Sequence, residues 1–360
     1  MPIRVFCRLK DNDDQLRIKK ISEEITNISI PYNHKNFEFQ VNQIWDRTNN
    51  QQVFETLMTK SVYPKNYWIL FGFTGTGKTY TTMSILNQLL SCYQQKITVS
   101  AFQIYNNDIY DLLTNKPLKY FKTTRLVIRG KSELVIEQEK DITKFLKKIN
   151  HNRNQNKTNF NNVSSRSHAL IEIEVDGKRY TIIDMAGQES GVQYQDKKLR
   201  AEGTNINLNM LALKECIRAF SQKSKFIPFR RTLLTFALKN MFSENNMVSF
   251  ICTISTKMPL FSQIDSLKYA HQLFDCGSSE LEFDYQDLIK DYNSYINECG
   301  WCNCEEIKIW REMNKQKYKN VRKIRKLVEQ KLKWINQFKN HLIQYQKINP
   351  ELEMSDNQDK

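Results

Sequence analysis

The sequence has no long apolar run and few cysteines for its length. None of its apolar stretches approaches the roughly 18 to 20 consecutive residues that a membrane-spanning helix needs. Its first eight residues carry charges where a secretory signal would be apolar. Eight cysteines in 360 residues are too few for a disulfide scaffold, which favours reduced thiols. We therefore expect a soluble intracellular protein without a membrane span.

Positive charge is in excess and is unevenly distributed. The chain has 54 Lys and Arg against 39 Asp and Glu, a formal net charge of +15, while 20 Phe and 16 Tyr supply a core and argue against bulk disorder. Residues 305–348 hold 13 basic and 4 acidic side chains, or +9, residues 349–360 contribute −3, and residues 1–304 carry the remaining +9. Such an excess favours an anionic partner, whether nucleic acid, an acidic protein surface or an anionic membrane.

Residues 3–274 alternate between strand and helix patterns. Runs of β-branched and aromatic residues predict strands at 3–8, 67–71, 97–105, 169–175, 180–185 and 247–255. Helical periodicity covers 78–90, 207–220, 229–242 and 263–274. The polar, Asn-rich stretch 150–162 is predicted to be a loop. This alternation predicts an α/β fold, with a central, mostly parallel β-sheet covered by helices on both faces.

A phosphate-binding motif follows the second predicted strand. Residues 72–79 read GFTGTGKT and fit the pattern GxxxxGK[ST], between a strand and an amphipathic helix. The glycines let backbone N–H groups surround phosphate oxygens, Lys78 neutralises phosphate charge, and the Thr79 hydroxyl can ligate Mg²⁺. A Gly-rich turn that only caps a helix is the alternative, and the strand-loop-helix context argues against it. The residues predicted to bind the nucleotide are Gly72, Phe73, Thr74, Gly75, Thr76, Gly77, Lys78 and Thr79.

A second motif lies at the end of the strand predicted over 180–185. Asp184 can hold Mg²⁺ through water, and Gly187 can donate its N–H to a γ-phosphate. Such a segment distinguishes ATP from ADP, because the γ-phosphate contact orders it and hydrolysis releases it. Alone, DxxG could be an ordinary turn at a strand end. Together with the phosphate loop, it indicates a nucleotide-sensing element.

A third motif makes the sequence similar to a known family. Residues 161–168, NNVSSRSH, resemble the N-x-x-S-S-R-S-H switch I segment of kinesin motor domains. With GFTGTGKT and DMAGQE, three kinesin nucleotide motifs stand in order, and further similarity extends over about residues 3–274. The resemblance implies a P-loop NTPase of the kinesin motor type, which hydrolyses ATP with Mg²⁺ and binds microtubules in the cytoplasm, on the cytoskeleton.

The resemblance also implies roles for individual switch residues. Ser165 would ligate Mg²⁺ and the γ-phosphate, while Ser164 and Asn161 would contact the γ-phosphate or the attacking water. Arg166 would pair with Glu189 to close the two switches, and Glu189 would take the proton of the nucleophile through a water relay. The alternative for Arg166 and Glu189 is a surface ion pair of little consequence.

Around the base of the nucleotide, the resemblance implies that Arg8, Lys10 and Tyr80 hold the adenine, Tyr80 by stacking and Arg8 through its planar cation. His168, the last residue of the switch I motif, is expected to be structural.

Several positions depart from the family pattern. Asp11 replaces the adenine-side proline, and Asn107 replaces a glutamate. Thr232-Leu233 replaces a Ser-Lys pair, and 207–210 (Asn-Leu-Asn-Met) replaces the Asn-Lys-Ser-Leu that opens the main microtubule-facing helix. We therefore expect intact nucleotide chemistry and an altered track-binding face.

The other basic residues do not decide how this protein would interact with microtubules. Lys223, Lys225, Arg230 and Arg231 are candidates for contact with acidic tubulin, or else form a solvated surface. The sequence 214–216, Lys-Glu-Cys, resembles internal-motor kinesins that depolymerise microtubules, which is a minority hypothesis. A non-motile, ATP-binding microtubule regulator is another alternative, and the kinesin-type switches argue against a nucleic-acid-dependent NTPase.

Beyond residues 3–274 we expect three segments. Residues 275–304 form a Cys-containing connector, 305–348 a basic amphipathic helix, and 349–360 an acidic, disordered tail. Apolar residues in 305–348 fit a heptad frame that is interrupted by three polar positions, so the helix could form a homodimer, fold back onto the motor or act as a basic arm. Four cysteines with His271 have zinc-ligand chemistry, yet their spacing matches no standard module and free thiols are favoured; the cysteines are Cys276, Cys299, Cys302 and Cys304.

Overall fold

The computed structural model describes residues 2–278, apart from 12–15, 23, 33, 46–48, 62, 156–165, 189–196 and 244. The predicted basic helix, the acidic tail and nearly all of the Cys-containing connector lie outside the described residues.

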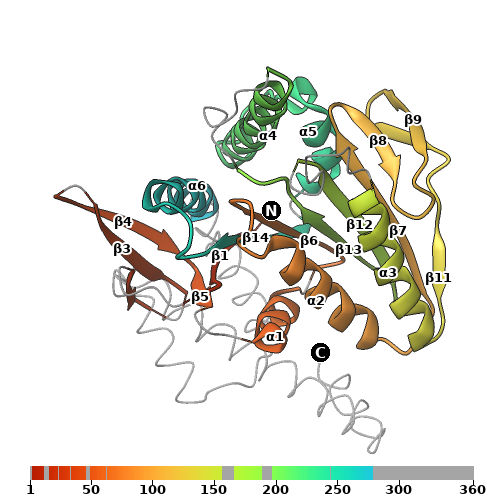
Figure 1. The fold of residues 1–360 in the computed structure, drawn as a ribbon, viewed down its shortest axis with the longest axis horizontal. Coiled ribbons are helices and arrows are strands. Elements are labelled where there is room, and N and C mark those ends of the chain that lie inside the picture. The colour runs from red at the N-terminus through yellow and green to blue at the C-terminus, as the bar shows by residue number, and fades with distance from the viewer. Residues whose placement is uncertain are drawn as a thin grey trace, which may run out of the picture. The chain divides into compact units, whose positions relative to one another are not determined.

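The described part is built on an eleven-stranded sheet (Figure 1). Its strands run in the order β10-β9-β8-β7-β12-β13-β6-β14-β1-β5, and β11 pairs with β7. The pairs between β13 and β5 are parallel, and the remaining pairs are antiparallel. The bounds are β1 (Ile3–Leu9), β5 (Gln43–Trp45), β6 (Lys65–Gly72), β7 (Ile97–Tyr105), β8 (Asp108–Asp111), β9 (Pro117–Lys122), β10 (Leu126–Arg129), β11 (Leu134–Ile136), β12 (His168–Val175), β13 (Lys178–Asp184) and β14 (Asn246–Ile254).

The register of the parallel strands places the ends of β13, β6, β14 and β1 at one edge of the sheet. Asp184 pairs with Leu70 near the end of β6, and Thr253 of β14 pairs with both Gly72 and Arg8. Because neighbouring parallel strands end at the same side, their carboxyl ends form a common rim. The predicted phosphate loop, acidic residue and adenine-side strand therefore meet at this rim.

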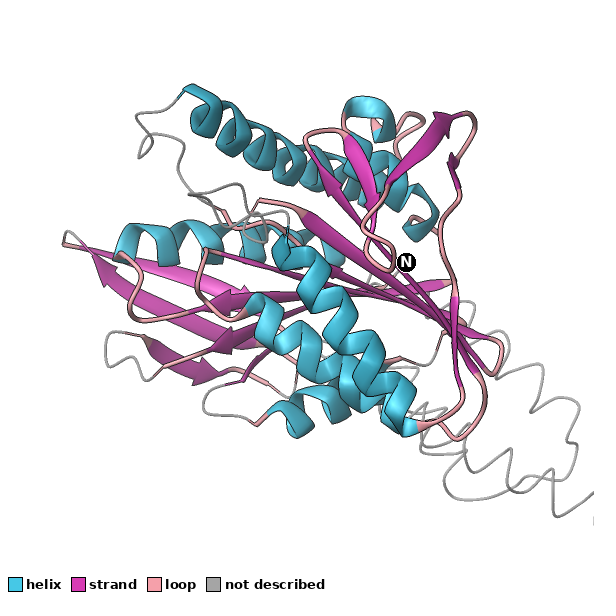
Figure 2. Cartoon of the chain, turned by 45° about the vertical axis from the view of Figure 1, so that its right-hand side comes forward, coloured by secondary structure: helices cyan, strands magenta, loops and turns pink. Residues whose placement is uncertain are grey.

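Helices cover both faces of the sheet, as predicted (Figure 2). On one face lie α1 (Asn50–Lys60), α2 (Lys78–Ser91) and α3 (Glu139–Gln155); on the other lie α4 (Lys197–Ser221), α5 (Leu233–Ala237) and α6 (Leu260–Ser278). Alternate side chains of a strand point to opposite faces of the sheet, so each face has its own apolar core. In β6, Tyr67, Ile69 and Phe71 enter the core on the α4–α6 side, while Trp68 and Leu70 enter the core on the opposite face. No helix among the described residues combines the length and apolarity needed to cross a membrane.

A small second sheet, absent from the sequence predictions, packs beside α6. It contains β2 (Arg17–Lys20), β3 (Thr26–Tyr32) and β4 (Lys35–Val41), all antiparallel. The Gln40 N–H donates to His271 Nδ1 on α6 at 3.1 Å. This contact joins His271 to the small sheet.

Two local predictions were wrong. The helix predicted over 229–242 is broken into η3 (Phe229–Arg231), α5 and η4 (Leu238–Met241), because Thr232 is extended (φ −135°, ψ 162°) and forms a capping box with Thr235 at the start of α5. The stretch predicted as a loop over 150–162 begins inside α3, whose helix continues to residue 155. Buried positions in α3 recur at helical spacing, and the continuing stripe is Ile142, Phe145, Ile149, Asn152 and Arg153.

Candidate nucleotide site

The phosphate loop is a tight turn between β6 and α2. Gly75 and Gly77 have φ values of 83° and 97°, in the left-handed region that favours glycine. A Cβ at Gly72 would lie 2.3 Å from the Thr253 carbonyl oxygen. The Thr76 hydroxyl donates to Phe73 O at 2.8 Å and lies 2.6 Å from Thr253 Oγ1. The loop thus lies directly against the end of β14.

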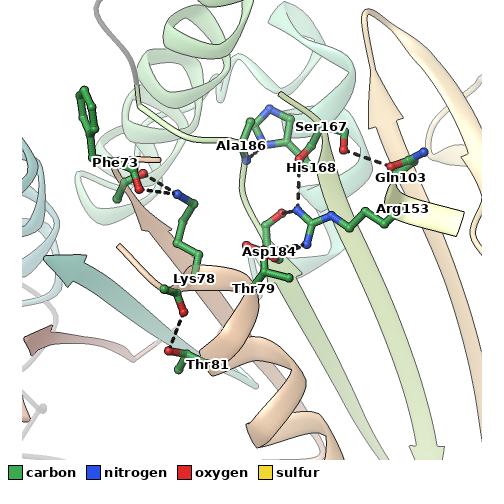
Figure 3. Close-up of polar contacts among 12 residues, drawn as sticks. Phe73, Lys78, Thr79, Thr81, Gln103, Arg153, Ser167, His168, Asp184 and Ala186 are labelled. Atoms are coloured by element: carbon green, nitrogen blue, oxygen red, sulfur yellow. Dashed lines mark hydrogen bonds and ion pairs between the residues drawn. The ribbon is translucent and has the colours of Figure 1, made fainter. Parts of the chain in front are cut away.

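Lys78 places a positive charge inside this loop. Its side chain is buried, and Nζ donates to Gly72 O at 2.9 Å and to Phe73 O at 2.8 Å (Figure 3). Lys78 is also the first residue of α2, where unpaired backbone N–H groups and the helix dipole favour an anion. The loop therefore has the donors and the charge that a phosphate group requires.

Thr79 and Asp184 supply oxygen atoms beside the loop. The Thr79 hydroxyl donates to Asp184 Oδ2 at 2.7 Å. The Asp184 side chain is 0% exposed, and its Oδ1 has no hydrogen-bond partner among the described residues. A buried carboxylate oxygen without a partner is costly, and hydroxyl and carboxylate oxygens are ligands that Mg²⁺ prefers. These two residues therefore fit a Mg²⁺ site, while Ser165, the third predicted ligand, lies outside the described residues.

Arg153 completes this cluster, and the sequence reasoning missed it. Its side chain is 6% exposed and forms an ion pair with Asp184 Oδ2. Its guanidinium also donates to Thr79 Oγ1 at 3.3 Å, to Ser167 O at 3.5 Å and to Asp184 O at 3.4 Å (Figure 3). Arg153 therefore balances the buried charge and joins α3 to α2, β12 and β13. The helical stripe along α3 was the signal that could have found it.

The segment after Asp184 packs on the phosphate loop. A Cβ at Gly187 would lie 2.0 Å from Thr74 Oγ1 and 3.1 Å from Thr74 N. The Gln188 N–H donates to Gly72 O at 3.1 Å. The structure thus brings the predicted nucleotide-sensing segment into contact with the predicted phosphate loop, with no room for a side chain at Gly187.

The three residues expected at the adenine lie around the first turn of α2. Arg8 Nη1 donates to Thr81 Oγ1 at 2.6 Å, and Lys10 Nζ donates to Gly75 O at 3.0 Å. Tyr80 is 69% exposed, so its ring is available to a ligand. Their roles toward adenine remain predictions.

The predicted switch residues are only partly described. Asn161, Ser164, Ser165 and Glu189 lie outside the described residues, and Arg166 is half-buried in the turn before β12. The end of the switch I motif is ordered by a buried hydrogen bond from Ser167 Oγ to Gln103 Oε1 at 3.0 Å.

Comparisons with known proteins agree with this geometry. Residues 7–275 match the family model of the kinesin motor domain. Diatom spindle kinesin-1 from Cylindrotheca fusiformis is 32% identical over 231 residues, covering 56% of this chain and 36% of that protein. Kinesin-like protein KIN-13B from Arabidopsis thaliana is 31% identical over 233 residues, covering 56% of this chain and 34% of that protein. The chain thus matches about a third of the length of each of these relatives.

The fold has a counterpart among solved structures. A KIF14 dimer, in a two-heads-bound state with AMP-PNP in complex with a microtubule, aligns with a TM-score of 0.62 and 23% identity. The alignment covers 76% of this chain and 93% of that chain. At this identity the likeness concerns the fold, whereas the family model extends over most of the sequence that forms the nucleotide site. The chain therefore belongs to the kinesin motor domain family.

Proposed function

We propose that this chain is a motor domain that couples ATP hydrolysis to microtubule binding and movement. The observation that carries the proposal is the meeting of three elements at one rim of the sheet: the phosphate loop around Lys78, the buried oxygen cluster at Asp184, and the Gly187 segment packed on Thr74. Membership of the kinesin motor domain family supports the same function. The expected location is the microtubule cytoskeleton of the cytoplasm.

Different residues at the rim bind the phosphates, the base and the Mg²⁺ ion. Backbone N–H groups of 72–79 and Lys78 bind the phosphates, and Arg8, Lys10 and Tyr80 hold the base. Thr79 and Ser165, with Asp184 acting through water, would hold Mg²⁺, whose charge offsets that of the phosphates. Positioning and charge stabilisation then supply most of the catalysis.

The switch residues are proposed to activate water. Asn161 and Ser164 orient the attacking water, and Glu189 accepts its proton through a second water. Arg166 pairs with Glu189 and so holds the two switches closed around the γ-phosphate. Gly187 donates its N–H to that phosphate, which makes the position of the segment depend on ATP.

A basic surface next to α4 is proposed to meet the acidic microtubule. Arg230 donates to Thr123 O at 2.7 Å, and Arg231 forms an ion pair with Glu215, so both are held by the domain itself. Lys223 and Lys225 are exposed and have no ion-pair partner among the described residues, and the next residue, Phe226, is 76% exposed. The basic face therefore comprises these lysines and exposed residues of the adjoining β9–β10 hairpin, namely Lys119, Lys122 and Arg125.

The Lys-Glu-Cys sequence gives no support to a depolymerase. Lys214 Nζ donates to Gln272 Oε1 at 2.9 Å, Glu215 pairs with Arg231, and Cys216 is buried. All three side chains therefore interact within the domain, which accounts for these residue types without a separate activity.

The test is ATP turnover by the full chain with and without microtubules, with DNA and RNA as polyanion controls and Lys78→Ala as the inactive control. Microtubules should raise turnover, and the nucleic acids should not. Stimulation by nucleic acid alone would contradict the proposal. Gliding of microtubules on surface-bound protein then separates a motor from a non-motile regulator, and filament length over time reports depolymerisation.

For residues 305–348, which lie outside the described residues, we propose a basic helix that associates two copies of the chain. The molar mass of the full chain in solution tests this directly, because one copy has a mass of 42.8 kDa. A mass of one copy across micromolar concentrations would contradict dimerisation.

A further inference from the structure

His168 lies where three functional segments meet. It is the last residue of the switch I motif and the first residue of β12, and it is 2% exposed. Its Nδ1 accepts the Ala186 N–H at 3.2 Å (Figure 3), and its Nε2 lies 3.4 Å from the side-chain amide of Asn209. Asn209 belongs to α4 and is 6% exposed. One ring therefore links β12, the segment after Asp184 and α4.

The direction of both hydrogen bonds is fixed. Because Nδ1 accepts the hydrogen bond from the Ala186 N–H, the neutral ring carries its proton on Nε2. This Nε2–H can donate to the Asn209 side chain when the amide, whose nitrogen and oxygen exchange places by a half-turn about its last bond, presents its oxygen. Burial, together with the positive charge of Arg153, lowers the pKa of His168 to about 4. The ring is therefore neutral near pH 7, and the two bonds coexist.

The Ala186 end of this chain of contacts lies beside the phosphate loop. Ala186 precedes Gly187, which packs so closely on that loop that an added Cβ would lie 2.0 Å from Thr74 Oγ1. A displacement of Gly187 by a γ-phosphate would also move the adjacent Ala186 N–H, and with it the His168 ring that accepts its hydrogen bond.

The Asn209 end of this chain of contacts lies on α4. The neighbouring buried side chains of α4 are apolar, namely Met210, Leu213 and Ile217, and α6 holds the helix through the Tyr269 hydroxyl, which donates to Met210 O at 3.0 Å. The contact with His168 adds a directional link between α4 and β12. Asn209 also stands where the kinesin pattern has the shorter serine of Asn-Lys-Ser-Leu, so this chain reaches His168 with a longer side chain.

We propose that His168 and Asn209 form a buried relay that transmits the position of Ala186–Gly187 to α4. Both are positioning residues, since neither contacts the phosphate loop. The relay rests on the proposed function for its purpose, because α4 adjoins the basic face. In physical terms it is a coupling between two sites, and a coupling of this kind changes affinities or populations by about fivefold to a hundredfold.

Hydrogen exchange of α4 tests the relay without microtubules. The exchange rates of α4 amides are compared in the full chain with ADP and with a non-hydrolysable ATP analogue, each with Mg²⁺. Two variants cut the relay at different points. Asn209→Ala removes the acceptor on α4, while His168→Asn keeps an oxygen for the Ala186 N–H and removes Nε2. Asn205→Ala, one turn earlier on α4, is the matched control.

Wild type and Asn205→Ala should show a difference in α4 exchange between the two nucleotides of about fivefold or more. Asn209→Ala and His168→Asn should each lose most of it, the double variant should lose no more, and nucleotide affinity should stay within twofold in all. A difference that persists in both single variants, or that is absent from the wild type, overturns the relay. If the relay is found but microtubules do not stimulate turnover, the proposed function fails and the relay stands.

Discussion

Replacing Arg153 with methionine should destabilise the domain strongly when Mg²⁺ and nucleotide are removed. Arg153 and Asp184 are 6% and 0% exposed, so the pair is shielded from solvent. Without the guanidinium, the Asp184 carboxylate retains the Thr79 hydroxyl and still lacks a partner for Oδ1. Removing one member of a buried ion pair costs about 3 to 5 kcal/mol, against roughly 0 to 1 kcal/mol for an exposed pair. Methionine fills much of the same volume, so the loss reports the charge.

Urea unfolding of the full chain, followed by the fluorescence of its five tryptophans, measures this loss in EDTA. The double variant Arg153→Met/Asp184→Asn should recover most of it, because neither member of the pair is left as an unpaired buried charge. Adding Mg²⁺ and ADP should stabilise Arg153→Met more than wild type, since the cation supplies the missing positive charge. A loss below about 1 kcal/mol for Arg153→Met in EDTA would refute the reasoning, because that is the range of an exposed pair.

Three further predictions concern the same rim. Lys78→Ala should abolish ATP turnover, measured as phosphate release, because it removes the charge inside the phosphate loop; normal turnover would contradict the site. Gly187→Ala should lower turnover by roughly 100-fold, since its Cβ would clash with Thr74 Oγ1 and displace the loop by about an ångström. Stability should fall by roughly 3 kcal/mol as the pH drops from about 6.5 to about 4, because the unfolded chain protonates His168 in this window and the folded chain does not. Urea unfolding across this range should show a shallower loss for His168→Asn, and an unchanged profile would contradict the burial of a neutral ring.

The parts of the fold that sequence could predict are those governed by local pattern. The phosphate loop is contiguous, and its glycines, Lys78 and the helix that follows depend on neighbouring residues. The alternation in β6 is just as local. The approach of Asp184 to the loop could be expected as well, because β13 and β6 are parallel neighbours whose ends meet. Gly187 then needs only three more residues of chain to reach Thr74.

The parts that escaped prediction depend on long-range packing. Arg153 looks like one polar residue in an Asn-rich stretch, and only the burial of α3 turns it toward Asp184. The break at Thr232 arises from a hydroxyl that caps α5 within an otherwise apolar, helix-like sequence. In the small sheet only the exposed first strand, β2, lacks alternation; β3 and β4 do alternate, with Ile28, Ile30, Phe39 and Val41 buried, and this local signal was overlooked.

Stability alone does not explain two buried polar contacts in this domain, which are called junctions here: the Arg153–Asp184 ion pair and the hydrogen bonds of His168. Apolar side chains of similar volume could replace the Arg153–Asp184 pair at little cost or with a gain in stability, so that pair is weak evidence for a stabilising role. The same reasoning applies to His168, whose neutral ring makes directional contacts at both nitrogens. The first junction joins α3 to the oxygen cluster, and the second joins α4 to the segment that contacts the phosphate loop. In the proposed relay, the directional contacts of His168 make the position of α4 depend on the state of the rim, which non-directional hydrophobic packing alone cannot do.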